Sequence, residues 1–213
     1  GRLYDRFRER VMFPIVNQKG EVIAFGGRVL GQGEPKYLNS PETPLFEKGR
    51  EVFGLPQARA AIREHDTVIV VEGYLDVVAL AQHGTGNAVA TLGTATTGMQ
   101  VQKLLRQAER IVFCFDGDAA GRKAAWRALE NSLEALTEQK SIAFVFLPDG
   151  EDPDSFVRRH GGGAFRQMIA QATPPDNPPP RMLTITSVTS GTSSRISRPI
   201  VPWPAITSRS SNG

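Results

Sequence analysis

The fold of this chain is decided by residues 68–76, which read Val68-Ile69-Val70-Val71-Glu72-Gly73-Tyr74-Leu75-Asp76. The β-branched run at its start predicts a strand that is covered on both faces, because such strands lose the alternation of a half-exposed sheet. A helical pattern follows over residues 75–82 and ends at Gly84, a normal helix stop. A buried strand that leads directly into a helix is typical of a parallel sheet flanked by helices.

The same alternation continues along the chain. Further strands are predicted over residues 88–92, 111–115 and 142–147, and further helices over 100–107 and 119–136. Strands that alternate with helices need crossover connections, which place helices on both faces of the sheet. We therefore predict an α/β domain over residues 66–150, followed by the start of a helical segment over residues 151–173.

A smaller α+β subdomain is predicted over residues 1–65. Residues 11–16 and 21–25 have strand character and flank a four-residue turn that ends in Gly20, which indicates a hairpin. Residues 31–40 have the composition of a loop, and a short helix is predicted over residues 57–64.

The last segment, residues 174–213, differs in composition from everything before it. It holds 8 prolines and 13 serines or threonines, and it has no helical period. Its prolines can neither continue a helix nor pair in a central strand. We predict a disordered or artefactual tail and assign no function to it.

Composition excludes several classes of protein. Of the 213 residues, 40% are hydrophobic and 22% are charged, as in ordinary globular domains, and no run of about 18 apolar residues exists that could span a membrane. No secretory signal is visible at the start. Cys114 is the only cysteine, which excludes an intrachain disulfide and argues against a cysteine zinc site. We expect a cytoplasmic protein and, because the chain begins at Gly1, a fragment of a longer one.

The net charge of +3 is unevenly distributed. Residues 1–65 carry 11 basic and 8 acidic side chains, residues 66–173 carry 10 and 13, and residues 174–213 carry 4 and 1. A basic segment joined to an acidic one is consistent with an anionic ligand held beside a cation site, although chance alone explains an imbalance of this size equally well.

Acidic residues follow three of the predicted strands. They are Glu72 with Asp76, then Asp116 with Asp118, and then the acids of residues 149–154. Each group alone has an ordinary explanation: an Asp-Gly-Asp is usually a surface turn, a glutamate after a strand suits a helix start, and Asp-Pro-Asp suits a helix N-cap. Their coincidence at one predicted edge of one sheet favours a ligand site instead.

Like charges crowded at one sheet edge are costly unless cations neutralise them. Hard divalent cations such as Mg²⁺ prefer carboxylate oxygens and leave coordination positions open for water and phosphate. The acids therefore suit metal-assisted chemistry on phosphates.

The segments around Glu72 and around Asp116-Gly117-Asp118 resemble the Glu and Asp-x-Asp motifs of a TOPRIM domain. Neighbouring segments narrow the resemblance to the bacterial DnaG-type replicative primases. They are residues 4–15, Phe25-Gly26-Gly27-Arg28, residues 35–43 and Leu147-Pro148-Asp149-Gly150-Glu151-Asp152-Pro153-Asp154. The resemblance covers roughly residues 2–172. It implies a DNA-dependent RNA polymerase that makes short primers on single-stranded DNA from ribonucleoside triphosphates.

The resemblance also implies roles for individual residues. Glu72, Asp116 and Asp118 would bind Mg²⁺ or Mn²⁺, with Asp116 shared between two ions. Asp76, Asp152 and Asp154 match further acids of the catalytic site. The positions expected to line the template and nucleotide groove are Arg28, Lys36, Tyr37, Asn39 and Lys48.

The chain departs from the family pattern at both ends. DnaG-type primases begin with a zinc-binding domain, for which this chain has no cysteines, and the first part of their catalytic core is not recognisable before Gly1. The tail stands where their helicase-binding region is expected. Zinc and the replicative helicase are therefore implied only for the complete family member, which would act in the cytoplasm at the replication fork.

Three alternatives remain open. One is a nucleic-acid-binding fragment without catalytic activity. Another is a nuclease, which the acids alone do not separate from a primase. A topoisomerase fits poorly, because it needs a nucleophilic tyrosine in a large gated domain for which this chain has no room.

Overall fold

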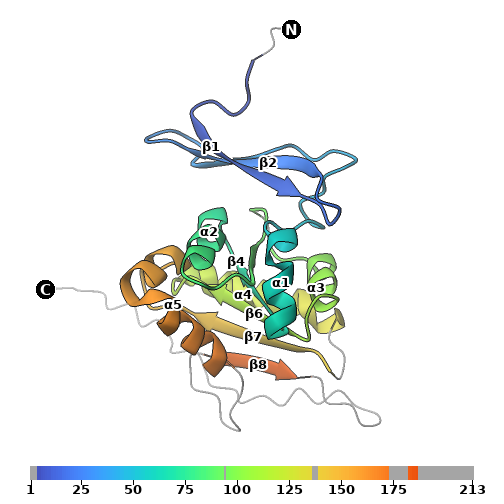
Figure 1. Ribbon diagram of the computed structural model, residues 1–213, viewed down its shortest axis with the longest axis vertical. Coiled ribbons are helices and arrows are strands. Elements are labelled where there is room, and N and C mark those ends of the chain that lie inside the picture. The colour runs from blue at the N-terminus through green and yellow to red at the C-terminus, as the bar shows by residue number, and fades with distance from the viewer. Residues whose placement is uncertain (1–3, 94, 136–138, 173–181, 187–213) are drawn as a thin grey trace, which may run out of the picture.

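The computed structural model describes residues 4–93, 95–135, 139–172 and 182–186. A small antiparallel sheet of order β1-β2-β3 precedes a larger sheet of order β5-β4-β6-β7-β8 (Figure 1). The strands are β1 (Arg10–Val16), β2 (Val22–Val29), β3 (Tyr37–Asn39), β4 (Thr67–Val71), β5 (Ala88–Ala90), β6 (Arg110–Phe115), β7 (Ser141–Phe146) and β8 (Met182–Thr186). The helices are α1 (Leu55–His65), α2 (Tyr74–Gln82), α3 (Gly98–Leu105), α4 (Ala119–Ser132), the 3₁₀ turn η1 (Leu133–Ala135) and α5 (Pro153–Gln171).

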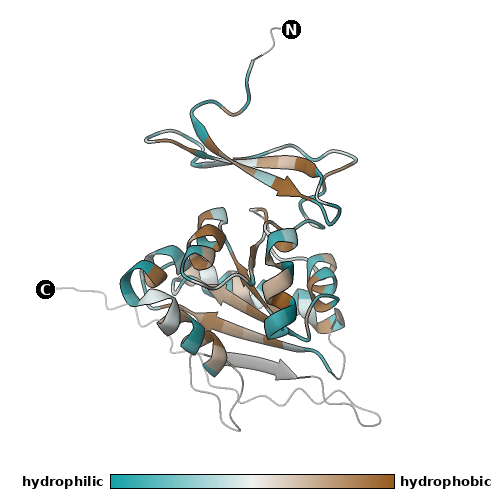
Figure 2. Ribbon diagram, in the orientation of Figure 1, coloured by the Kyte–Doolittle hydropathy of each residue, from teal (hydrophilic) through white to brown (hydrophobic). Residues whose placement is uncertain are grey.

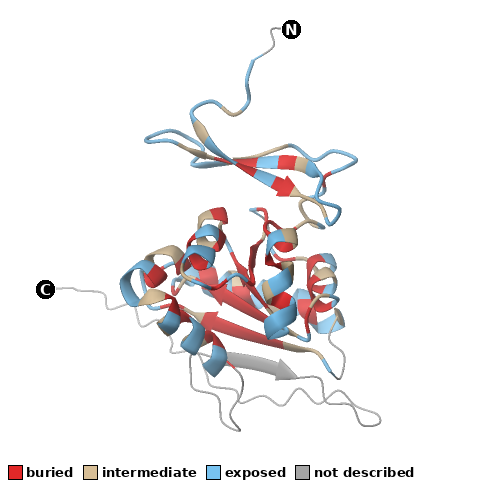
Figure 3. Cartoon of the chain, in the orientation of Figure 1, coloured by how far each residue is buried: buried red, intermediate tan, exposed pale blue. Residues whose placement is uncertain are grey.

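The larger sheet is parallel from β5 to β7 and is covered on both faces, which confirms the predicted α/β class. Alternate residues of each strand enter two separate cores. Ile69 and Val112 pack with α2 and α5, whereas Val68 and Ile111 pack with α1, α3 and α4. Strands β4, β5, β6 and β7 are accordingly apolar and buried along most of their length (Figures 2 and 3). Burial on both faces is the physical reason for the continuous apolar runs in the sequence.

The small sheet packs onto the start of α2 through aromatic side chains. Phe13 of β1 stacks on Tyr74 with ring centroids 5.2 Å apart, and Phe53 meets Tyr74 edge-on at 4.8 Å. A side chain at Gly26 of β2 would collide with the Tyr74 ring, since its Cβ would lie 2.6 Å from ring carbons. These contacts fix the small sheet beside the segment that follows β4.

The structure corrects several predicted boundaries. Residues 37–39 form β3 within a segment predicted as loop, because Gly26 to Arg28 supply a ladder for them. The helix predicted to Leu136 ends as α4 at Ser132 and continues only as η1. Met182–Thr186 pairs antiparallel with β7, inside the tail for which no regular structure was predicted. The rest of that prediction concerns residues outside the described ranges.

None of the helices that the structure describes combines the length and the apolar character needed to cross a membrane.

Candidate active site

The carboxyl ends of β4, β6 and β7 form one edge of the larger sheet and carry the acids singled out in the sequence. β6 lies between β4 and β7, and both pairings are parallel, so the three strands end on the same side. Glu72 comes directly after β4, Asp116 directly after β6, and residues 147–152 connect β7 to α5. In open α/β sheets this is the edge at which ligands bind.

The pKa values of Glu72 and Asp116 are both raised by burial and by neighbouring acids. Partial burial raises the pKa of Glu72, and the charges of Asp116 and Asp118 raise it further, while a backbone amide of Asp116 partly offsets the change. The pKa of Asp116 is raised by burial and then by Asp152 and Asp118. The four carboxylates are therefore near enough to repel one another, as expected of a site that a cation would stabilise.

Asp76 is the most strongly perturbed acid of this edge. Burial raises its pKa from 3.8 to about 7, and the charges of Asp152 and Asp116 contribute to the increase. Its Oδ2 accepts a hydrogen bond from the amide of Gly73 at 3.0 Å, and its Oδ1 accepts one from the amide of Asp154 at 3.4 Å. Asp76 thus joins the start of α2 to the start of α5.

Three of the acids predicted to belong to the site, Asp118, Asp152 and Asp154, also make local contacts that stabilise helices. Asp118 caps α4 by accepting the Gly121 amide at 2.7 Å, and Asp152 caps α5 by accepting the Ser155 amide at 2.7 Å, with proline at the first helical position. Asp154 is paired with Arg158 at 2.6 Å. The helix-cap interpretation of Asp-Pro-Asp is therefore correct for Asp152. In each cap, the bond to the amide uses one carboxylate oxygen, Oδ1.

Glycines hold the Asp116–Asp118 turn tightly against its surroundings. A Cβ at Gly117 would overlap the carbonyl oxygen of Leu147, and one at Gly121 would overlap the carbonyl oxygen of Asp116. Only glycine permits such close approach of backbone to backbone. The two glycines therefore fix where the aspartates lie relative to the end of β7, a role that the sequence analysis did not identify.

The donor set of this edge fits a hard divalent cation in chemistry, because it consists of carboxylates. The pKa values of Glu72 and Asp116 are raised first by burial and then by neighbouring negative charges. Among the described residues, however, no three His, Cys, Asp or Glu side chains converge closely enough to hold an ion as they stand. Glu72, Asp116 and Asp118 are thus brought to one edge, and their role as metal ligands remains a prediction.

The small sheet carries three of the predicted nucleic-acid residues, Arg28, Tyr37 and Asn39, on the face that contacts Tyr74. Arg28 of β2 pairs in register with Tyr37 of β3, and Gly26 pairs with Asn39. These positions share the face of the sheet that contacts Tyr74, and the Tyr37 and Tyr74 rings lie 6.5 Å apart. Within the described part of the chain, the Nε of Arg28 is buried and has no hydrogen-bond partner. An unpaired guanidinium nitrogen at this position suits an anionic ligand.

Asn39 differs from the other predicted ligand residues because its side-chain amide is already engaged. Its Nδ2 donates to the carbonyl of Leu92 at 3.0 Å, and its Oδ1 accepts the hydroxyl of Tyr74 at 2.7 Å. Burial raises the pKa of Tyr74 to about 12, so the hydroxyl stays protonated as a donor. Asn39 therefore ties the small sheet to the larger domain.

Lys36 and Lys48 take no part in these contacts between the small sheet and the larger domain. Lys36 is exposed, and its Nζ lies 5.9 Å from the centre of the Tyr37 ring. Lys48 lies in the segment between β3 and α1, whose backbone is bound to α3. The sequence analysis did not identify the α3 residue that makes this contact, Gln100, because nothing in its local pattern distinguishes it from a surface glutamine.

Comparisons with known proteins agree with the fold described above. Residues 1–59 match the family described as DNA primase catalytic core, N-terminal domain, and residues 69–157 match the family described as Toprim-like. The first match ends within α1 and the second begins within β4.

Several curated relatives with high identity are DNA primases. The chain is 61% identical over 175 residues to the DNA primase of Pseudomonas aeruginosa, a match that covers 82% of this chain and 26% of the relative. It is 59% identical to that of Neisseria meningitidis and 57% identical to that of Escherichia coli K12, covering 82% of this chain and 30% of each relative. The chain therefore spans less than a third of these proteins.

Solved structures give the same result at the level of the fold. A DNA primase domain from Pseudomonas aeruginosa matches with a TM-score of 0.76 and 62% identity, over 79% of this chain and 52% of that chain. A DnaG primase catalytic domain bound to single-stranded DNA matches with a TM-score of 0.77 and 56% identity, over 80% of this chain and 55% of that chain.

Proposed function

The chain belongs to the DnaG-type DNA primases and matches part of their catalytic core, and from this we propose that it takes part in the synthesis of short RNA primers on a single-stranded DNA template. The reaction joins a 3′-hydroxyl to the α-phosphate of a ribonucleoside triphosphate and releases pyrophosphate. It is a nucleotidyl transfer, and the complete protein would perform it in the cytoplasm, at the replication fork, together with the replicative helicase.

The observation that carries the proposal is the placement of an acidic sheet edge beside the small-sheet face that carries Arg28. Glu72 and Asp116 end adjacent strands, and Arg28 and Tyr37 lie on the sheet face that packs against Tyr74, two residues beyond Glu72. A site that binds a polyphosphate with its metal ions needs side chains of both charges. Cationic groups bind the phosphate oxygens, and acids hold the metal ions.

Glu72, Asp116 and Asp118 are the residues that would hold Mg²⁺ or Mn²⁺. Such ions, when bound, stabilise negative charge on the transferring phosphate and make a hydroxyl easier to deprotonate. Burial is the main cause of the raised pKa values of Glu72 and Asp116, and repulsion from neighbouring acids adds to it. A nearby cation would lower both pKa values by stabilising the ionised carboxylates, which is consistent with this role.

The chain's own basic and aromatic residues would bind and orient the nucleic acid. Arg28, Lys36 and Lys48 would contact phosphates, which positions a strand without selecting its sequence. Tyr37 is 39% exposed, and its ring is available to stack on a base. A solved relative with 56% identity is bound to single-stranded DNA, which supports the same class of ligand here.

The test is primer synthesis by a full-length primase that carries this segment, compared with its Asp116→Asn variant. We expect the rate to fall about a hundredfold or more, because the change removes one charge from the transition-state environment. Asp149→Asn is the matched control, since the Asp149 side chain is 90% exposed and lies on the β7–α5 connection outside the predicted ligand set.

Unchanged synthesis by the Asp116→Asn enzyme would refute the proposed catalytic edge. Binding of single-stranded DNA without any synthesis by the unmodified protein would favour a binding segment over an enzyme, and Mg²⁺-dependent cleavage of the template would favour a nuclease.

A further inference from the structure

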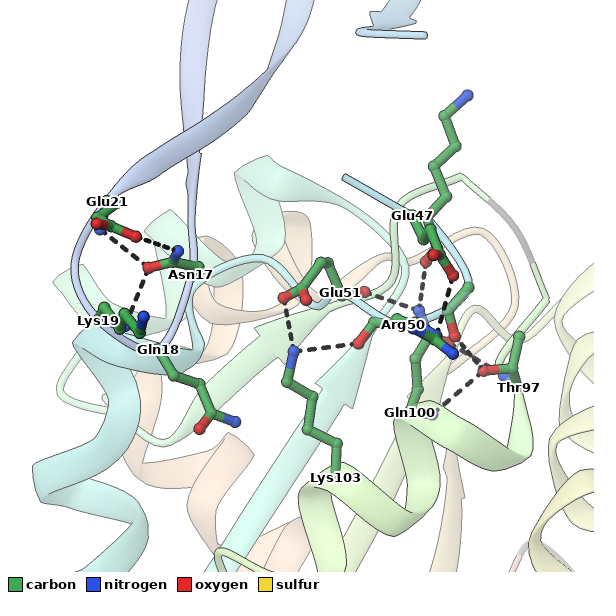
Figure 4. Close-up of polar contacts among 12 residues, drawn as sticks. Asn17, Gln18, Lys19, Glu21, Glu47, Arg50, Glu51, Thr97, Gln100 and Lys103 are labelled. Carbon is green, nitrogen blue, oxygen red and sulfur yellow. Dashed lines mark hydrogen bonds and ion pairs between the residues drawn. The ribbon is translucent and has the colours of Figure 1, made fainter. Parts of the chain in front are cut away.

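Residues 48–51 form an irregular turn whose backbone is bound by α3 (Figure 4). The amide of Gln100 donates to the carbonyl oxygens of Lys48 and Glu51, both at 2.8 Å. Thr97 donates its hydroxyl to the carbonyl of Gly49, and Lys103 donates to that of Arg50 at 3.1 Å. Four successive carbonyl oxygens are thus satisfied by side chains from one helix and its N-cap.

Gln100 is the centre of this arrangement. It is fully buried, and both hydrogens of its amide are used by the turn. Its Oε1 accepts the backbone amide of Thr97 at 3.0 Å in a reciprocal capping box with the Thr97 hydroxyl. An unpaired buried polar group is costly, so the Gln100 amide is restricted to the one orientation in which all its hydrogen bonds form. Those hydrogen bonds also fix the backbone of the turn.

The same turn leaves one positive charge free. Arg50 is paired with Glu47 at 2.9 Å, and Lys103 is paired with Glu51 at 2.6 Å. Within the described residues, the ammonium of Lys48 has no hydrogen bond or ion pair. The neighbouring cations are neutralised within the protein, and Lys48 alone remains available to an external anion.

The turn also lies at the sheet edge that carries the acids. Thr97 belongs to the connection that follows the carboxyl end of β5, and β5 pairs in parallel with β4, which ends at Glu72. A side chain at Gly49 would lie 3.5 Å from the Thr97 methyl group, which confirms the close contact between turn and connection. Lys48 is therefore anchored on the β5 side of the edge.

We propose that Gln100 is a positioning residue that holds the backbone of Lys48 so that its ammonium meets a phosphate of single-stranded nucleic acid. The proposal rests on the phosphate contact assigned to Lys48 above. Lysine is long and flexible, and fixing the backbone beneath it reduces the conformational entropy that is lost when the ammonium binds. Gln100 itself is buried and touches no ligand.

A double-mutant cycle tests the coupling in the 213-residue chain. The four proteins are the unmodified chain, Lys48→Ala, Gln100→Ala and the double variant, and the probe is a fluorescent oligothymidylate titrated at several salt concentrations. Lys48→Ala should weaken binding and reduce the slope of log K against log salt by about 0.7, the value for one phosphate contact on a single strand. Gln100→Ala should weaken binding several-fold and reduce the slope in the same direction, although it removes no charge.

The decisive result is that the double variant binds no more weakly than Lys48→Ala alone. Gln102→Ala is the matched control, because Gln102 is an exposed glutamine on the same helix and should leave binding unchanged. If Gln100→Ala does not fold, as judged by circular dichroism, Thr97→Val takes its place in the cycle, since it removes only the hydroxyl bond to Gly49 and the cap.

Additive losses in the cycle would overturn the proposal, because Gln100 would then act through the fold in general. An unchanged salt slope for Lys48→Ala would also overturn the proposal, because it would show that Lys48 makes no phosphate contact. That second outcome leaves the catalytic edge to be judged by the Asp116→Asn assay alone.

Discussion

Replacing Asp76 by asparagine should remove much of the pH dependence of this protein's stability. The pKa of Asp76 is 3.8 when the chain is unfolded and about 7 when it is folded, mainly because the carboxyl is buried. Between these values the folded state holds a proton that the unfolded state has lost. The free energy of unfolding therefore falls as the pH rises from about 4 to about 7 and then levels off.

The size of the effect follows from the two pKa values. A displacement of this extent corresponds to about 4 kcal/mol at full effect. Asp76 is partly solvent-accessible, so we expect about 2 kcal/mol after allowance for screening. Asparagine can still accept the Gly73 amide, but its NH₂ faces the Asp154 amide, which costs about 1 kcal/mol at every pH.

The assay is urea unfolding of the 213-residue chain at pH 5 and at pH 8, without divalent cations. The unmodified chain should lose about 1 kcal/mol more than Asp76→Asn over this interval, because part of the effect falls below pH 5, and the variant should be the more stable protein at pH 8. Asp149→Asn, at an exposed position, is the control and should follow the unmodified chain. Parallel behaviour of Asp76→Asn and the unmodified chain would show that Asp76 is already ionised at pH 5 and would refute the reasoning.

Two further predictions concern the basic side chains expected to bind phosphates and the turn that holds Asp116 and Asp118. The triple substitution of Arg28, Lys36 and Lys48 by alanine should flatten the salt dependence of single-stranded DNA binding by about 2 in the log–log slope, and a fluorescence titration that finds the original slope would make these residues an ordinary solvated surface. Gly117→Ala should destabilise the chain by about 2 kcal/mol or more, because its Cβ has no room beside the backbone that follows β7, and a thermal melt within a degree of the original would contradict that close packing.

Local sequence patterns determined the architecture of the larger domain. Val68 to Val71 and Ile111 to Phe115 are continuous apolar runs, and each is followed by a helical period, so strand, helix and crossover could be predicted without knowledge of distant contacts. The acids after these strands were brought to one edge for the same reason, since parallel strands end on the same side. This part of the candidate site needs only strand direction to be predicted.

Contacts between distant segments decided the rest. Asn39 carries a polar side chain suited to a ligand, yet the structure bonds it to Tyr74 and Leu92, which lie 35 and 53 residues away. Gln100 has an unremarkable local sequence, and its importance comes from a turn that lies about 50 residues earlier.

The protonation of Asp76 likewise depends on tertiary structure. Its pKa is raised by burial and by acids from the ends of two other strands, none of which is adjacent in sequence. Periodicity records which face of an element is buried, but a buried hydrogen bond or a shared electric field depends on which elements meet. Only the folded chain brings those groups within a few ångströms of one another, and at that distance polar and charged interactions become strong.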